Sequence, residues 1–447
     1  MPTPPKVEQG AFDGVDKEMC TLYVLKGTYN EYWLVEGFGD FNNIVEFDAN
    51  ALDLTTGTFT YNSNRSGSLS SLGVAGMLTS VGIDRNFKTT IKNLKLSGSL
   101  NIYNMKVVRE LYAEGLENLD LKNATFEGTI DVTVTGQWYG TPLDLQVSFD
   151  KGLFSYLYNL HNIVLPDNLT SISEEMFAYN HCLKSVTIPA SVNDIGKLAF
   201  CQCSGLTSLT IPSSVTKIDC WGVFYGCSGL TSLTLPSCVT KIDWGTFQGC
   251  SGLTSLTIPS SVTKIGESAF QGCSGLTSLT LPSSVTSIGK NAFNGCSGLT
   301  SLTLPSSVTS IGWYAFKGCS RLTTLTIPSS VTWIGLEAFS GCSGLTSIYA
   351  YLEKIPELGP DVFTGCNAQN CTVYVPTGTV DAYKSSKFGY FENIVEFDAT
   401  GIDKVAISTN AKEVSRYSAN GQRLSAPAKG LNIVKYSDGS VKKVVVQ

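Results

Sequence analysis

A motif of 23 residues recurs through the middle of this 447-residue chain and reads L-T-S-L-T-I/L-P-S-S-V-T-x-I-G-x-x-A-F-x-G-C-S-G. Its leading leucines are Leu206, Leu230, Leu253, Leu276, Leu299, Leu322 and Leu345. The spacing is 23 throughout, except for one additional residue near Cys220. Weaker copies led by Leu160 and Leu183 precede them. A fixed period of this length is typical of a solenoid, in which each repeat forms one coil.

Within one repeat, the segment L-x-x-L-x-L/I-P has the alternation of a short strand whose leucines point inward, and the proline ends it. A second extended piece, V-T-x-I-G, turns at glycine, and x-x-A-F-x-G-C predicts about one helical turn with Ala and Phe inward. One repeat is too small to bury a stable core, so neighbouring repeats must stack. We therefore expect a repeat solenoid, a right-handed coil with short parallel β-strands and short helical turns.

The composition excludes several classes of partner. Charged residues make up 15% of the chain, the net charge is −6, and Lys and Arg form no run, so the basic surface that a phosphate backbone requires is missing. We expect no nucleic-acid partner. The sequence contains no run of 18 apolar residues, so we expect no transmembrane helix. Its N-terminus, Met-Pro-Thr-Pro-Pro, has neither the charged nor the apolar region of a signal peptide.

Residues for catalysis are not arranged as chemistry requires. The two histidines, His161 and His181, lie in loops of the weak repeats, without the spacing of a catalytic triad or a zinc motif. Paired carboxylates for glycoside hydrolysis would have to come from variable turn positions, which are more simply solvated: Asp219, Asp243, Glu267 and Glu337. The sequence therefore predicts a protein that is not an enzyme, with no catalytic residues, no metal site and no cofactor.

The chain has fourteen cysteines, and six of them recur once per repeat: Cys227, Cys250, Cys273, Cys296, Cys319 and Cys342. A small residue that packs beside phenylalanine suits this position, so we expect a column of buried, unreactive thiols. Neighbouring members could also lie within disulfide distance. Five of the eight cysteines outside this column are less predictable: Cys201, Cys220, Cys238, Cys366 and Cys371.

Recognition by a solenoid must use side chains that point outward, and the first strand offers a nearly constant set of hydroxyls. This set includes Thr234, Thr257, Thr280 and Thr303. Threonine suits an exposed strand for reasons of β-propensity and solubility alone. The functional alternative is a hydrogen-bonding surface of low charge for a protein or a glycan.

Large aromatic residues form a second set of candidates, at positions near the I-G turn where other repeats carry Lys, Glu, Ser or Leu. They are Trp221, Tyr225, Trp244, Trp313, Tyr314 and Trp333. Exposed aromatic residues are enriched at binding interfaces. The alternative is that they fill a groove at the edge of the solenoid.

Lysines form a third set. Lys217, Lys241 and Lys264 occupy the same position in three successive repeats, so we expect a column with about 5 Å between neighbours. Carboxylates two or three residues further on would offset the repulsion between like charges. A solvated face is the simpler interpretation, and an acidic patch on a partner is the alternative.

The pattern L-x-x-L-x-I/L-P-x-x-V-x-x-I-G-x-x-A-F-x-x-C resembles the repeat of the BspA-type leucine-rich-repeat family, over residues Leu160 to about Cys366. Members of this family are surface or secreted proteins of host-associated bacteria, and some are adhesins. The resemblance implies a non-enzymatic protein, extracellular or on the outer cell surface, that binds a host or bacterial protein or glycan, and we expect a monomer. The alternative is a structural spacer that displays an upstream domain.

The same comparison divides the chain. Residues 49–158 hold the first irregular repeats and a segment that resembles the family's N-terminal cap, with strand, helix and strand expected over 88–126. Residues 159–365 form the repeat array, and residues 366–400 resemble its closing segment. Residues 1–48 repeat that closing text, from Cys20 instead of Cys371, and predict the remnant of an upstream array. In residues 401–447, two hairpins with Asn-Gly and Asp-Gly turns predict a small all-β domain that resembles a sorting tail.

Overall fold

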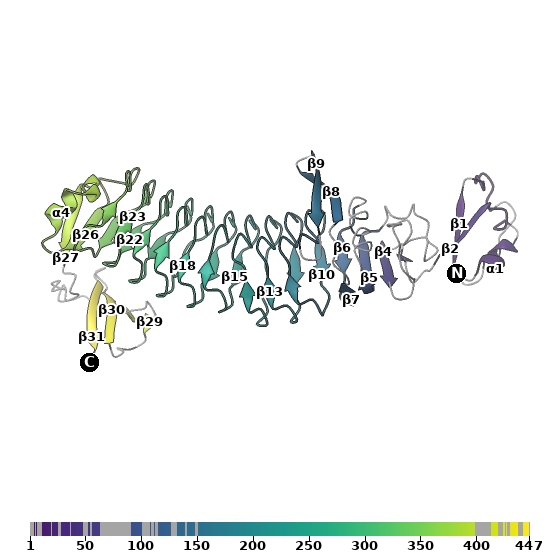
Figure 1. Ribbon diagram of the computed structural model, residues 1–447, viewed down its shortest axis with the longest axis horizontal. Coiled ribbons are helices and arrows are strands. Elements are labelled where there is room, and N and C mark those ends of the chain that lie inside the picture. Colours follow the sequence, from purple (N-terminus) through teal and green to yellow (C-terminus); the bar gives the residue numbers. More distant parts are fainter. Residues whose placement is uncertain are drawn as a thin grey trace.

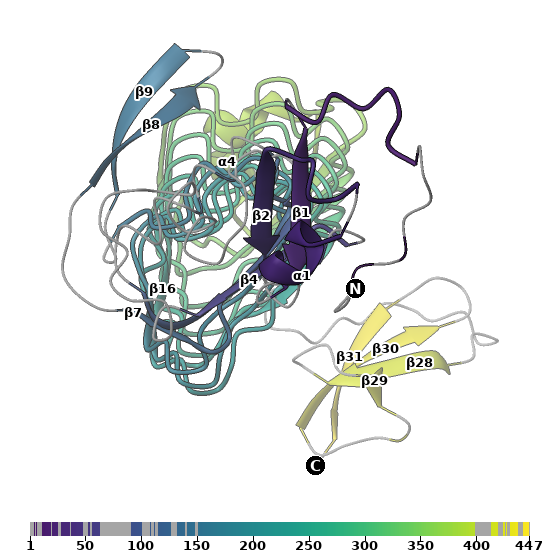
Figure 2. The same cartoon turned by 90° about the vertical axis from the view of Figure 1, so that its right-hand side faces the viewer.

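The computed structural model describes residues 151–397 continuously, together with shorter stretches within 4–147 and within 413–446. Successive coils of backbone lie side by side along one long axis (Figure 1). In the view along that axis, the coils superimpose on one another (Figure 2). The expected repeat solenoid is confirmed.

The first strand of each coil pairs in parallel with its copies in neighbouring coils, one repeat apart. In the register of Leu233 with Leu256, the leucine points inward, and the serine and threonine beside it are exposed. Some coils make only single bridges here, as between Ser278 and Ser301. Strands of this kind are β6 (Asn118–Asp120), β10 (Asn162–Val164), β12 (Ser185–Thr187), β15 (Ser232–Thr234), β17 (Ser255–Thr257), β20 (Ser301–Thr303), β22 (Thr324–Ile327) and β24 (Ser347–Ala350).

The second strand of each coil forms a separate parallel ladder. It comprises β11 (Ser171–Ile172), β13 (Asp194–Ile195), β14 (Lys217–Ile218), β16 (Lys241–Ile242), β18 (Lys264–Ile265), β19 (Ser287–Ile288), β21 (Ser310–Ile311), β23 (Trp333–Ile334) and β25 (Glu357–Leu358). The ladder is interrupted between β14 and β16, in the repeat that contains the additional residue near Cys220.

The segment around each phenylalanine forms consecutive turns, and no residue between 151 and 371 is helical. Alternate amides reach across to the next coil: Phe247 N donates to Ala269 O at 2.8 Å. The amide between two such donors closes a turn within its own coil, as Gln248 N does with Gly245 O at 3.1 Å. The expected helical turn is therefore not formed, because half of its amides bond between coils.

Phenylalanines fill the centre of the stack, one per coil. Their rings lie nearly parallel, and the centroids of Phe293 and Phe316 are 5.1 Å apart. Beside them, the repeated thiols are fully buried, and each donates to a backbone carbonyl of a preceding coil, as Cys250 Sγ does to Phe224 O at 3.1 Å. The cysteines are free. The predicted buried column of thiols is confirmed.

N-terminal to the array, β4 (Thr58–Asn62), β5 (Asn93–Leu100) and β6 continue the parallel sheet up to β10, so coils are stacked ahead of Leu160. The expected strand, helix and strand within 88–126 are present as β5, β6 and the helical residues Val108 and Leu111. The other strands here are β3 (Leu52–Asp53), β7 (Ala124–Phe126), and the hairpin β8 (Val132–Trp138) with β9 (Thr141–Val147). This hairpin was not predicted, and it projects from the side of the stack (Figure 2).

The last coil is covered by β26 (Thr372–Pro376), α4 (Val380–Lys384), the 3-10 helix η2 (Lys387–Tyr390) and β27 (Asn393–Phe397). Here Phe363, from the last turn segment, packs against Phe388 and Phe391 with ring centroids 5.0 and 5.1 Å apart. This segment therefore closes the hydrophobic core, as the sequence predicted for residues 366–400.

The chain ends in a four-stranded antiparallel sheet of β28 (Glu413–Ser418), β29 (Arg423–Leu424), β30 (Gly430–Tyr436) and β31 (Val441–Val446). Pairing of β28 with β29 and of β30 with β31 confirms the two predicted hairpins. Their Asn-Gly and Asp-Gly turns lie outside the described residues. Among the helices described, none is long and apolar enough to cross a bilayer.

Candidate functional site

The residue three positions before each core phenylalanine lies in one column along the surface. Backbone bonds between coils keep this column in register, as where Gly222 N donates to Trp244 O at 2.8 Å. We call it the outer column: Lys151, Glu174, Lys197, Trp221, Trp244, Glu267, Lys290, Trp313, Leu336 and Pro360. Charged residues therefore precede a pair of tryptophans in successive coils.

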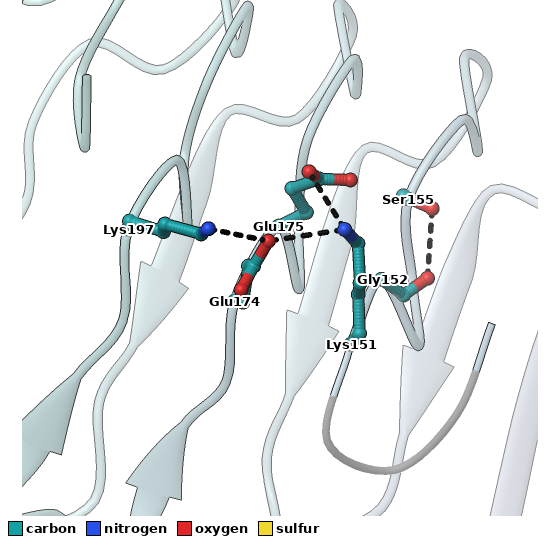
Figure 3. A network of polar contacts seen from close by, with 6 residues as sticks. All are labelled: Lys151, Gly152, Ser155, Glu174, Glu175 and Lys197. Carbon is teal, nitrogen blue, oxygen red and sulfur yellow. Dashed lines mark hydrogen bonds and ion pairs between the residues drawn. The ribbon is translucent and has the colours of Figure 1, made fainter. Parts of the chain in front are cut away.

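The charged part of the outer column is a network of ion pairs (Figure 3). Glu174 bridges Lys151 at 3.0 Å and Lys197 at 3.2 Å, and Lys151 also contacts Glu175 at 3.4 Å. Burial alone would raise the pKa of Glu174, but hydrogen bonds from the two lysines lower it. The carboxylate of Glu174 is therefore ionised at neutral pH, and the two lysines balance its charge.

The next two members of the column are stacked. The indoles of Trp221 and Trp244 lie 4.6 Å apart, and Tyr225 lies parallel to Trp244 at 6.1 Å. Trp221 remains 41% exposed. The inserted residue, Cys220, comes directly before Trp221, so the interruption of the second ladder lies beside this aromatic pair.

A second aromatic pair lies just before and within the weak repeat led by Leu160. Tyr156 and Tyr179 stack with ring centroids 4.6 Å apart. Both have left-handed backbone, with φ of 60° and 64°, at a position where seven later coils carry glycine with positive φ. A left-handed residue other than glycine costs roughly 1–2 kcal/mol. Gln202 has φ 59° at this position in the next coil, so three successive coils have left-handed backbone here without glycine.

The two pairs border one groove of about 310 Å³. One coil separates the pairs, and it supplies Leu198 and Cys201, with no aromatic ring, to the lining. The full lining is Tyr156, Glu175, Ala178, Tyr179, Leu198, Cys201, Trp221, Tyr225 and Trp244. We call this the aromatic groove.

The chemistry of the aromatic groove suits binding. Burial and the charge of Glu175 raise the pKa of Tyr156 to about 12, and the same two causes raise that of Cys201 to about 12. Both groups are therefore neutral at physiological pH, and a neutral thiol is a poor nucleophile. In the part of the chain that the structure describes, no cluster of side chains could hold a metal ion.

Two further predicted residues lie three coils beyond the groove. Trp313, in the outer column, is 50% exposed. Tyr314 beside it has left-handed backbone, and the Nζ atom of Lys317 lies 5.2 Å from the centroid of its ring. Lys317 also pairs with Glu337 at 2.5 Å. These residues form a separate surface.

Trp333 and the lysines lie on the second strand instead. Trp333 stands opposite Ser310 and Glu357 in the ladder. Lys241 and Lys264 are register partners, as predicted. The ladder is interrupted between Lys217 and Lys241, so only two of the three predicted lysines are register partners, and Lys217 pairs with Asp194 of the preceding coil at 3.0 Å.

The hydroxyl surface is exposed as predicted, at Thr234, Thr257, Thr280 and Thr303. Between the coils led by Leu206 and Leu253, it is hollowed into a groove of about 520 Å³, to which Thr234 and Thr257 contribute. Apart from strand leucines, Ile211 and Pro236, this groove is lined by serine and threonine. It holds no charged or aromatic side chain.

Sequence reasoning missed Tyr156, Tyr179 and Glu175. The signal was present, because both tyrosines replace the glycine that follows Phe-x in the later repeats.

Several solved structures are similar to this chain. A leucine rich cell surface protein from Faecalibacterium prausnitzii A2-165 is 28% identical, covering 56% of this chain and 84% of its own, with a TM-score of 0.37. A leucine-rich repeat protein from Bacteroides ovatus ATCC 8483 is 24% identical, with coverage of 54% and 79% and a TM-score of 0.31. The T. pallidum leucine rich repeat protein is 28% identical, with coverage of 41% and 77% and a TM-score of 0.29.

A search of curated proteins finds no match. The model of the BspA type leucine rich repeat region matches in six copies, over residues 147–277 and 263–395. These ranges cover more than half of the chain, and they coincide with the stacked coils and the closing segment. The chain therefore belongs to the BspA-type leucine-rich-repeat family, whose repeats form non-catalytic solenoids.

Proposed function

We propose that this chain is a non-enzymatic binding protein of the bacterial cell surface, and that it holds a neutral glycan in the aromatic groove. The family supports a surface location and a binding role. The resemblance of residues 401–447 to a sorting tail supports export. The aromatic groove supports the ligand class.

The observation that carries the proposal is the break between the two ring stacks. Tyr179 and Trp221 are two coils apart, which is about 9.6 Å along the axis at the usual strand spacing. Tyr179 follows its core phenylalanine and Trp221 precedes its own, so the two pairs approach the intervening coil from different columns. One flat ring of a ligand over that coil could contact both pairs, because aromatic rings pack at 4.5 to 7 Å between centroids. A sugar ring has the required shape, with an apolar face for the aromatic rings.

The polar groups of the site favour a ligand rich in hydroxyls and without net charge. Glu175 offers a carboxylate that can accept hydrogen bonds from sugar hydroxyls, while its charge is balanced by Lys151 at 3.4 Å. Only 15% of the whole chain is charged, so electrostatic attraction contributes little to recognition.

The test is a glycan array of neutral host and dietary oligosaccharides probed with the full chain, followed by calorimetry with the best-bound sugar. Trp221→Ala and Tyr179→Ala should each weaken binding at least tenfold, about 1.4 kcal/mol. Trp313→Ala is the matched control, because it removes another half-exposed tryptophan, four coils from Trp221, and it should change affinity less than twofold.

Equal losses for Trp221→Ala and Trp313→Ala would contradict a ligand in the aromatic groove. Binding to immobilised matrix proteins that survives enzymatic removal of their glycans, and is lost with Trp221→Ala, would replace the glycan by a peptide in the same groove.

The second candidate function is a structural spacer. It is favoured by the near identity of the coils from Leu253 to Leu345, which presents little variation for recognition. A spacer should bind neither the oligosaccharides of the glycan array nor the matrix proteins.

A further inference from the structure

Two distant segments of the chain have the same fold. In residues 21–47, β1 (Thr21–Leu25) pairs in parallel with β2 (Asn43–Phe47), and α1 (Tyr29–Trp33) connects them. In the segment that closes the array, β26 pairs with β27 in the same register, and α4 lies between them. Thr21 is opposite Asn43 as Thr372 is opposite Asn393.

The local hydrogen bonds are duplicated as well. Val15 N donates to Phe12 O at 3.1 Å, and its counterpart Cys366 N donates to Phe363 O at 3.0 Å. Left-handed glycines lie between these residues in both copies, Gly14 at φ 82° and Gly365 at φ 80°. The turn segment that leads into the closing segment is therefore repeated too.

The loops that follow make matching bonds. Cys20 N donates to Asp16 O at 2.8 Å, and the equivalent Cys371 N donates to Asn367 O at 3.1 Å. Asn42 N bonds to Lys17 O at 3.1 Å. Its counterpart is the bond from Glu392 N to Ala368 O at 3.0 Å.

The aromatic packing follows the same plan. Phe12 contacts Phe38 and Phe41 with ring centroids 5.2 and 5.3 Å apart. These distances match those of Phe363 to Phe388 and Phe391. Phe12 is thus the equivalent of Phe363, the core phenylalanine of the last coil.

The two copies differ in burial on one face. Cys371 is fully buried, whereas Cys20 is exposed. Cys366 is 7% exposed, and its counterpart Val15 is 40% exposed. Two further pairs differ in the same direction: Phe363 against Phe12, and Val373 against Leu22.

In the C-terminal copy, this face is covered by the last coil. Strand β24 pairs with β26, and Thr372 N donates to Thr346 O at 2.9 Å. Among the described residues, β1 pairs only with β2. The exposed positions of the N-terminal copy are therefore those that a preceding coil would cover.

We propose that residues 11–47 form a second closing segment, and that its exposed face receives the last coil of a leucine-rich-repeat array that precedes Ala11 in the same polypeptide. This inference is independent of the glycan proposal. Phe363 belongs to the last coil and to the closing segment at once, because the chain runs directly from one into the other. Phe12 is the equivalent of Phe363 in the N-terminal copy. The coil to which Phe12 belongs must therefore be formed by residues that precede it in the chain.

A second copy of this chain is a poorer occupant. The last coil of its array is already covered by its own closing segment, as Thr372 N and Thr346 O show. Covalent connection also supplies the coil at high effective concentration and in the correct direction.

The test is a chimera of the full chain in which a copy of residues 276–361 is placed directly before Ala11, so that the junction reproduces Asp361–Val362. Alkylation of Cys20 by iodoacetamide at pH 8 should slow at least tenfold, and exchange of the amides of residues 21–25 should slow by a similar factor. Cys371, buried in every version, is the internal reference.

The matched control is the same chimera with the inserted copies of Leu345 and Ile348 changed to aspartate, because both side chains are buried in the last coil. Cys20 should then react as fast as in the parent chain. Unchanged alkylation and exchange in the first chimera would overturn the proposal. So would a concentration-dependent dimer of the parent chain that protects Cys20, since a second copy would then occupy the face.

Discussion

Gly289 lies against Gly266 so closely that a Cβ atom on Gly289 would stand 2.6 Å from the carbonyl carbon of Gly266. The atoms in the way belong to the backbone, which cannot move aside as the end of a flexible side chain can. At Gly289 the distance between coils therefore leaves no room for a side chain, whereas Asp219 and Asp243 occupy this position in the two coils beside the interruption of the ladder. This contact recurs at Gly312, whose Cβ would lie 2.5 Å from the carbonyl carbon of Gly289.

Gly289→Ala should destabilise the array by about 2–3 kcal/mol, because it forces two coils apart. The matched control is Gly295→Ala in the same coil. There φ is 75° but a Cβ would lie 3.8 Å from the nearest atom, so the cost should be about 1 kcal/mol. Urea unfolding followed by circular dichroism measures the free energy of unfolding of both variants. A larger loss for Gly295→Ala than for Gly289→Ala would refute the steric explanation.

Phe270→Ala should lower the free energy of unfolding by about 3–5 kcal/mol, since it leaves a cavity between two stacked rings. The centroids of Phe247 and Phe293 lie 5.4 and 5.1 Å from that of Phe270. Thr277→Ala, at an exposed position of the next coil, should stay within about 0.5 kcal/mol. A small effect of Phe270→Ala in the same unfolding assay would mean that the ring column contributes little.

The buried thiols should make the array sensitive to alkali. Burial raises the pKa of Cys273 from its ordinary 9.0 to about 12. The folded state favours the neutral thiol, and this contribution to the free energy of unfolding is fully present below pH 9. It is lost progressively as the pH rises towards 12, by up to about 1.4 kcal/mol per pH unit. Unfolding at pH 8, 9.5 and 10.5 under reducing conditions should show a shallower decline for Cys273→Ala than for the parent chain. Parallel declines would contradict the prediction.

Tyr179→Gly should separate stability from binding. It removes a left-handed tyrosine with φ 64°, and the strain released, about 1–2 kcal/mol, offsets the lost ring contact. We expect a stability change below about 1 kcal/mol and a loss of glycan affinity of at least tenfold. Tyr314→Gly, with φ 57° and away from the groove, should retain affinity. A loss with both variants would point to a general change in the coils.

Much of the fold was predictable because one repeat contains the information for its own strands. Leu233 and Ile242 lie inward where the alternation placed them, and Cys250 lies beside Phe247 as its recurrence indicated. The turn segment was misjudged as helical. Its amides bond to the next coil, as Phe247 N does, and such a partner cannot be seen within a single repeat.

The candidate site was only partly predictable. Trp221 and Trp244 were identified from their variability, and the structure brings them together. Trp333 was grouped with them, although it precedes the isoleucine of the second strand and so lies in another column. Lys217 was placed in one column with Lys241 because the effect of the inserted Cys220 on strand pairing could not be read from spacing alone.

The near-identical coils from Leu253 to Leu345 lie between the aromatic groove and the C-terminal sheet. Each of these coils presents equivalent contacts to both neighbours, with rings 5.1 to 5.4 Å apart. Unequal recombination within this stretch of gene could add or delete one coil and leave both junctions intact. The distance between the aromatic groove and the closing segment is therefore adjustable by inheritance, in increments of about 4.8 Å, without alteration of the residues that line the groove.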